Sequence, residues 1–161
     1  MDKPWQHLPP RARAIATTTT EAVDAARAGD PEAFGEATGR LAEFNPEQIR
    51  LVLGAVVRTL LEDQHAEGLT GDDVQAGLAR CVRSTIDWFP ELDASVLVVL
   101  VTSAFGVHPE EDEVAAPTPL AVARHATLLI ADLVAAEDRP LAGYLVASLA
   151  EIARAETVEM P

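Results

Sequence analysis

The chain has 161 residues, of which 48% are hydrophobic, 24% charged and only 4% aromatic, and it carries a formal net charge of −14 from 26 acidic and 12 basic residues. A surface of this charge repels phosphate backbones and anionic membranes, so the composition argues against binding to nucleic acid or to a membrane. The length suits one domain with a hydrophobic core, and the scarcity of aromatic residues favours alanine-rich helices over a β-sandwich or barrel.

The cysteine content and the apolar runs predict a cytoplasmic protein. Cys81 is the single cysteine, which excludes an internal disulfide and a cysteine-rich metal site. The first ten residues hold one lysine and no apolar run, unlike a signal peptide. The longest apolar run, 94–105, contains three hydroxyl residues and is shorter than the roughly 20 residues that span a bilayer.

At the N-terminus, residues 1–8 are predicted to form a flexible tail, which Trp5 can attach to the body of the protein. A first helix is expected over residues 9–28, although four consecutive threonines at 17–20 are poor helix formers. Gly29 is placed to end this helix, because glycine adopts the left-handed conformation of a C′ position without strain.

Three dipeptides predict the starts of further helices: Asp30-Pro31, Asn45-Pro46 and Thr118-Pro119. In each, a short polar side chain can accept a hydrogen bond from a free N–H of the first turn. The proline that follows lacks an N–H that would have no partner there, and its fixed φ suits a helix.

The second helix is expected to reach Phe44, with Gly35 and Gly39 forming a flat strip where another helix crosses closely. The third helix, from Pro46, has a broad apolar face at helical spacing. That face consists of Ile49, Val52, Leu53, Val56, Val57, Leu60 and Leu61.

The fourth helix is predicted to start at a capping pair, Thr70 with Asp73, and to run to Phe89. Asp93 can cap a fifth helix over Ala94–Phe105. Because this segment is apolar all round, we expect it to be almost wholly buried and to form the centre of the fold.

Residues 107–117 are predicted to form an exposed acidic loop, and a sixth helix follows from Pro119. The last helix has an apolar stripe that starts at Leu141, and residues 157–161 are expected to fray. The predicted fold is therefore all-α, with one domain over residues 9–156. It has six or seven helices in successive antiparallel hairpins around the buried central helix.

No catalytic, metal or cofactor site is predicted. Glu62 and His65 have the Glu-x-x-His spacing of di-iron bundles, but the second copy is missing, since Val122 stands three residues before His125. His108 and the acidic residues after it lack the spacing and glycine of an EF-hand loop. No motif of nucleophilic catalysis or phosphate binding is present.

Five residues are candidates for a partner or ligand contact: Trp88, Phe89, His125, Tyr144 and Arg58. The aromatic pair suits a docking point or, more commonly, the end of a core. The leading hypothesis is a non-catalytic protein that acts through protein–protein contacts, including self-association. The alternative is a small-molecule-binding protein or enzyme with a pocket between helices, near the last three candidates. A third is a structural remnant without separable activity.

Overall fold

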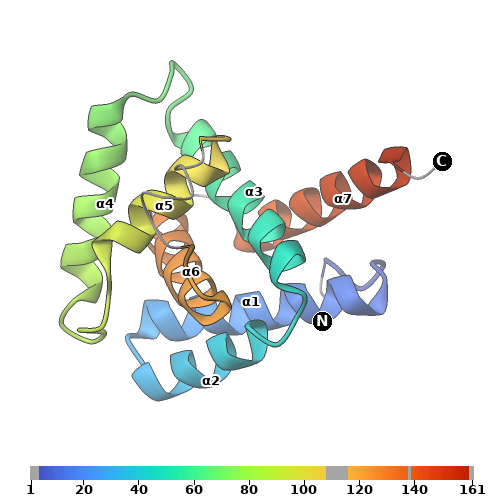
Figure 1. Cartoon of the computed structure of the whole chain (residues 1–161), viewed down its shortest axis with the longest axis horizontal. Coiled ribbons are helices and arrows are strands. Elements are labelled where there is room, and N and C mark those ends of the chain that lie inside the picture. The colour runs from blue at the N-terminus through green and yellow to red at the C-terminus, as the bar shows by residue number, and fades with distance from the viewer. Residues whose placement is uncertain (1–3, 108–115, 138, 160–161) are drawn as a thin grey trace.

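The computed structural model describes residues 4–107, 116–137 and 139–159, and in these residues all regular structure is α-helical. The all-α class and the single domain are therefore confirmed. The helices are α1 (Pro10–Ala28), α2 (Pro31–Leu41), α3 (Pro46–Gln64), α4 (Gly71–Thr85), α5 (Ala94–Ala104), α6 (Pro119–Ala135) and α7 (Leu141–Glu159). Figure 1 shows α1 and α2 side by side, with α6 in the middle of the molecule.

The three predicted proline-marked caps are confirmed. Asp30 accepts a hydrogen bond from the backbone N–H of the third residue after it at 3.1 Å, and Asn45 and Thr118 do the same at the same distance. In each case the proline is the first residue of the helix. Local chemistry thus starts α2, α3 and α6 at the predicted residues.

Of the other helix ends, two follow the predicted chemistry and two do not. Thr70 and Asp73 form a reciprocal capping box, and Gly29 ends α1 in the left-handed conformation with φ of 65°. However, α2 ends at Leu41 rather than Phe44, and α4 ends at Thr85 rather than Phe89. Turns follow both ends, so the apolar residues expected in the last helical turn are held by loops instead.

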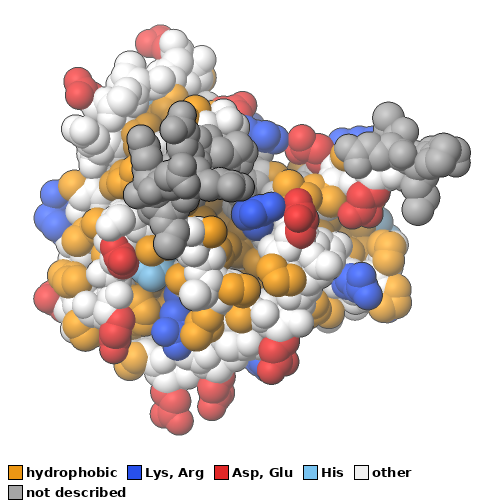
Figure 2. Space-filling model, in the orientation of Figure 1, with side chains coloured by type: hydrophobic (Ala, Val, Ile, Leu, Met, Phe, Trp, Pro, Cys, Tyr) orange, Lys and Arg blue, Asp and Glu red, His pale blue; other side chains and the backbone are white. Residues whose placement is uncertain are grey.

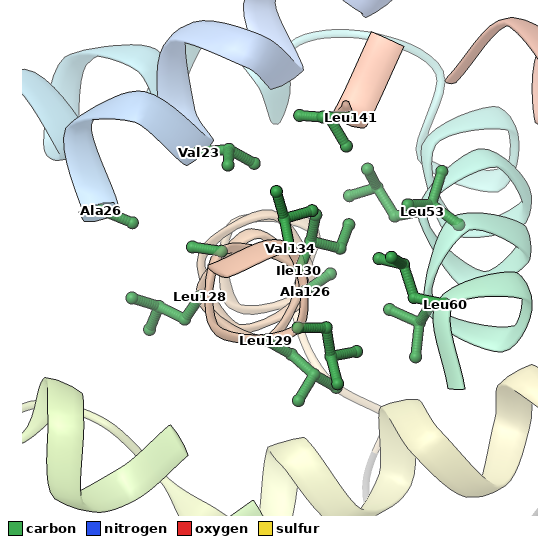
Figure 3. Close-up of a cluster of buried hydrophobic side chains, with 14 of the residues drawn as sticks. Val23, Ala26, Leu53, Leu60, Ala126, Leu128, Leu129, Ile130, Val134 and Leu141 are labelled. Carbon is green, nitrogen blue, oxygen red and sulfur yellow. The ribbon is translucent and has the colours of Figure 1, made fainter. Parts of the chain in front are cut away.

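The central helix is α6, and the prediction that residues 94–105 form it is wrong. α6 buries eleven of its 17 residues, whereas α5 buries two of its 11, Leu97 and Val101. α6 packs against α1, α2, α3, α4 and α5. Figure 3 looks along α6 and shows side chains of α1, α3 and α7 around it, including Val23, Leu60 and Leu141.

The reason lies in what an apolar helix does and does not specify. An apolar surface all round permits burial on any side, but burial needs neighbours on every side. Leu97 and Val101 lie one turn apart and face the core, while Val98 between them is 46% exposed. α5 is therefore a peripheral helix with an apolar outer surface.

The packing also departs from successive hairpins. α1 packs on α2 and α5 on α6, as that arrangement requires. α3 instead packs mainly on α6 and α7, and α1 packs on α6, so several main contacts join helices far apart in sequence. The predicted apolar face of α3 is buried at every position, and it supplies these long-range contacts.

The predicted attachment of the N-terminal tail through Trp5 is confirmed, and one smaller expectation fails. The side chain of Trp5 is buried and its Nε1–H donates a hydrogen bond to Thr17 Oγ1 at 3.2 Å, so residues 5–8 are attached to α1 rather than free. No neighbouring helix or side chain of the described residues lies within 4 Å of where a Cβ atom of Gly35 or Gly39 would stand, so no helix crosses there.

The predicted acidic loop and the C-terminal end differ from the rest in what the structure describes. α7 continues to Glu159, so it is longer than the predicted limit of residue 156. Most of the predicted acidic loop, residues 108–115, lies outside the described residues.

Candidate functional site

A wide groove lies between α3, α5 and the C-terminal half of α7. Its volume is about 1280 Å³, and its walls come from the end of α2 and the turn after it, α3, the end of α5, the first half of α6 and residues 151–156 of α7. Figure 2 shows hydrophobic side chains in a hollow beside α3, with basic and acidic side chains next to them.

The groove exposes large apolar side chains that a packed monomer would normally cover. Leu51 on α3 is 48% exposed and Phe105 at the end of α5 is 37% exposed, and both line the groove. Val98, two turns before Phe105 on α5, is 46% exposed, and Val107 is 62% exposed. We call Leu51, Val98, Phe105 and Val107, together with the groove, the α5 face.

Both arginines of the groove are paired with carboxylates within the chain. Arg50 contacts Glu47 at 3.1 Å, and Arg58 contacts Glu151 at 3.2 Å and Glu62 at 3.5 Å. These side chains are largely exposed, so the pairs contribute little to stability. They leave no converging set of unpaired polar groups of the kind that orients a small ligand.

Two features of the sequence belong to this face, although neither predicts it alone. Leu51 lies off the apolar stripe of α3, among polar and charged residues. The all-apolar α5 segment predicts a core helix, and its pattern does not show which of its residues lie on the surface. In both places the sequence has more large apolar residues than the core buries.

Trp88, Phe89 and His125 meet at a different place, where α4, α2 and α6 come together. Phe89 is buried and its ring lies 5.5 Å from that of Phe34, while the Trp88 ring lies 5.3 Å from Phe34. The His125 ring lies 6.3 Å from Phe89. The aromatic pair therefore closes one end of the core.

His125 connects α6 to the start of α5. Its buried Nε2 accepts a hydrogen bond from the backbone N–H of Asp93 at 3.0 Å, and its Nδ1 lies 2.8 Å from the carbonyl oxygen of Ala121. Because Nε2 accepts, the ring is neutral with its proton on Nδ1. Burial lowers the pKa of His125 below its ordinary value of 6.5, and Arg124 acts in the same direction.

We expect His125→Gln to flatten the pH dependence of stability between about pH 7 and pH 5. In the parent, the unfolded chain takes up a proton at His125 below the ordinary pKa of 6.5, while the folded chain keeps the ring neutral, so stability falls as the pH falls. The amide oxygen of Gln can still accept from the Asp93 N–H, so the loss at neutral pH should stay below the about 1–3 kcal/mol of an unsatisfied buried donor. Urea unfolding at several pH values measures both effects.

The carboxyl group of Asp93 provides the contrast for this experiment. Hydrogen bonds from Ser95 lower its pKa from the ordinary 3.8, so its contribution is present above that pH and is lost only in more acidic solution. A variant that keeps the full slope between pH 7 and pH 5 would show that His125 does not cause it.

Tyr144 and Arg58 do not join His125 in a pocket. The Tyr144 hydroxyl donates a hydrogen bond to Asp63 Oδ2 at 2.9 Å near the end of α3, and burial with this carboxylate raises the pKa of Tyr144 to about 12. Arg58 lines the groove and is ion-paired. The five candidate residues thus fall in three separate places, and Arg58 alone belongs to the groove.

A second, smaller hollow of about 420 Å³ lies between the ends of α3 and α6 and the start of α4. It includes His65, whose Nε2 is 3.9 Å from Asp73 Oδ1 and whose Nδ1 is 3.0 Å from the carbonyl oxygen of Leu61. Among the described residues, no three His, Cys, Asp or Glu side chains gather closely enough to hold a metal ion.

Cys81 is fully buried on α4, and burial raises the pKa of its thiol to about 12. The thiol is therefore protonated at neutral pH, and it packs as a small apolar group. This arrangement does not suit a nucleophile, for which a thiolate is needed.

Comparison with models of protein families, with curated proteins and with solved structures found no match to this chain. Within the described residues, none of the helices combines the length and the apolar character that crossing a membrane requires.

Proposed function

We propose that this protein is non-catalytic and acts through protein–protein contacts made by the α5 face. The observation that carries the proposal is that Leu51 and Phe105, 48% and 37% exposed, line one largely apolar groove, while Val98 and Val107 on or just after α5 are also exposed. Contiguous apolar patches next to a groove are typical of interaction sites. Covering such side chains releases about 25 cal/mol for each Å² removed from water.

The shape of the groove favours a macromolecular partner over a small ligand. Its volume of about 1280 Å³ exceeds the roughly 300–1,000 Å³ of usual ligand pockets. Its arginines are already paired with carboxylates of the same chain. A small-molecule-binding protein or enzyme would instead present a few polar groups that converge on one point.

A cytoplasmic location is part of the same proposal. The single cysteine, Cys81, is a buried free thiol with no disulfide partner in the chain, which is the usual situation in a compartment that keeps thiols reduced. The strongly negative charge would favour solubility there.

Site-specific photo-crosslinking in the source cells tests the proposal. A photoreactive phenylalanine analogue is placed at Phe105, and the matched control carries it at Ile86, which has nearly the same exposure (38% against 37%) but lies outside the groove, at the end of α4. We expect strong crosslinked adducts from position 105 and few from position 86.

The adducts are then identified by mass spectrometry, and the contact is rebuilt from purified components. We expect Leu51→Lys to weaken the rebuilt contact at least about tenfold, because a charge would be buried at its centre. Equal labelling at both positions, or none at 105, would overturn the proposed function.

A further inference from the structure

We propose that His125 is a pH-sensitive attachment point for α5: its neutral ring holds the start of α5 against α6, and its protonation in mild acid lets α5 open while the other helices stay folded. Such opening is a motion within one chain, so it does not depend on the proposed function. It also differs from a loss of overall stability, because one helix opens ahead of the rest.

α5 is held to the rest of the molecule by few side chains. Of its 11 residues, only Leu97 and Val101 are buried. No ion pair joins it to another helix in the described part of the chain, since residues 94–107 contain no charged side chain. Segments with few buried apolar contacts are the ones that open locally in folded proteins. α5 is therefore a helix that can open at low cost in free energy.

One hydrogen bond joins residues 93–107 to another helix, within the residues that the structure describes. His125 Nε2 on α6 accepts it from the backbone N–H of Asp93 at 3.0 Å. Asp93 is the N-cap of α5, and its Oδ1 accepts from the backbone N–H of Ser95 at 2.9 Å. His125 therefore holds the residue at which α5 begins.

The ring of His125 keeps this bond only while it is neutral. Nδ1 lies 2.8 Å from the carbonyl oxygen of Ala121 and carries the proton, which leaves the lone pair of Nε2 for the N–H of Asp93. A second proton, on Nε2, would point at that N–H, so two donors would face each other. The bond would be lost, and the N–H of Asp93 would be left without its acceptor.

The surroundings of His125 are apolar rings and two charged groups. Phe89, in the turn after α4, places its ring 6.3 Å from the imidazole, and Phe34 of α2 packs edge to face against Phe89. The charged groups are Asp93 at the start of α5 and Arg124 on α6 itself. The carboxylate favours the protonated ring, and the guanidinium opposes it.

The sign of the pH dependence follows from comparing closed and open α5. Burial is the largest influence on His125 and holds its pKa below the ordinary 6.5 while α5 is closed. Opening lets water reach the ring, so the pKa returns toward 6.5. The open form then takes up a proton that the closed form does not, and a falling pH favours opening. At about pH 5 the open population gains at most about thirtyfold, the limit set by protonation of the open form alone.

The attachments of the helices around α5 involve no histidine. Arg80 on α4 contacts Asp132 of α6 at 3.2 Å, and Arg58 on α3 contacts Glu151 of α7 at 3.2 Å. Among these attachments, that of α5 alone depends on the protonation of an imidazole. We therefore expect mild acid to loosen α5 first.

Native-state hydrogen exchange of the purified full chain, followed by NMR, tests the proposal. Protection factors, which are corrected for the effect of pH on the intrinsic rate, are compared at about pH 7.5 and pH 5, with and without about 1 M urea. We expect amides at 97–101 to be at least about tenfold less protected than those of α3 and α6 and to be insensitive to the urea, because their exchange exposes little surface. Their protection should fall several-fold in acid, within the limit of about thirtyfold.

Two glutamine variants connect this fall to one imidazole. His125→Gln keeps an acceptor for the N–H of Asp93 and cannot be protonated, so its α5 amides should change less than about twofold between the two pH values. The matched control is His65→Gln, at a part-buried histidine that follows α3 and lies near Asp73 of α4. This control should keep the full fall of the parent.

The opposite results are equally clear. Protection of α5 that is the same at both pH values, or that falls as much in His125→Gln as in the parent, overturns the proposal. Exchange of α5 that rises with urea as steeply as that of α3 and α6 means that it opens only with the whole chain, and overturns it too. If His125→Gln does not fold, the parent decides: the amide resonance of Asp93 must move with the ¹⁵N resonances of the His125 ring, and titration of the ring without that response contradicts the attachment.

Discussion

Leu97→Asp should unfold the protein or lower its free energy of unfolding by several kcal/mol, whereas Val98→Asp in the same helix should change it by less than about 1 kcal/mol. Leu97 is fully buried against the core, and Val98 is 46% exposed. An unpaired carboxylate in the core cannot keep its water, and the resulting cost is comparable with the whole stability of a domain, about 5–15 kcal/mol.

Urea unfolding followed by far-ultraviolet circular dichroism measures the two variants. Low concentration keeps the chains apart, so that any self-association does not add to the difference. Similar losses for both variants would mean that α5 is covered on both sides. That result would restore the buried central helix expected from its sequence and would remove the α5 face as a docking surface.

Phe34→Ala should lower the free energy of unfolding by about 3–5 kcal/mol, the usual cost of truncating a buried phenylalanine. Phe34 is fully buried on α2, and its ring meets those of Trp88 and Phe89 edge to face. Removing it leaves a cavity and takes away aromatic contacts worth about 0.5–1.5 kcal/mol each beyond burial.

The matched control for this variant is Phe105→Ala, which removes the same atoms from a partly exposed position. We expect it to cost less than about 1 kcal/mol in the monomer, because water already covers part of the ring. Thermal and urea unfolding should rank the two variants in this order. The reverse order would show that Phe105, and not the cluster of Phe34, Trp88 and Phe89, belongs to the core.

The position of α5, which carries part of the α5 face, depends in part on His125. This residue holds the backbone of Asp93, the N-cap of α5, against α6. Protonation of Nε2 would remove that acceptor and weaken the start of α5. The pH profile of His125→Gln therefore reports on how firmly α5 is attached to the central helix.

The sequence by itself determined the local features of this protein. Asp30, Asn45 and Thr118 start helices because their side chains accept hydrogen bonds from the N–H group three residues ahead, an interaction that needs no distant partner. The buried face of α3 was also readable, since its apolar residues lie on one side and its polar residues on the other.

Only the tertiary structure decided which helix is central and which apolar residues remain uncovered. α5 and α6 are both rich in apolar residues, and nothing within either segment states how many neighbours it will have. Whether a helix is buried depends on helices that are distant in sequence, and here α1 and α3 both pack against α6. For the same physical reason the α5 face was not predicted: exposed Val98 and buried Leu97 differ in their neighbours rather than in their chemistry.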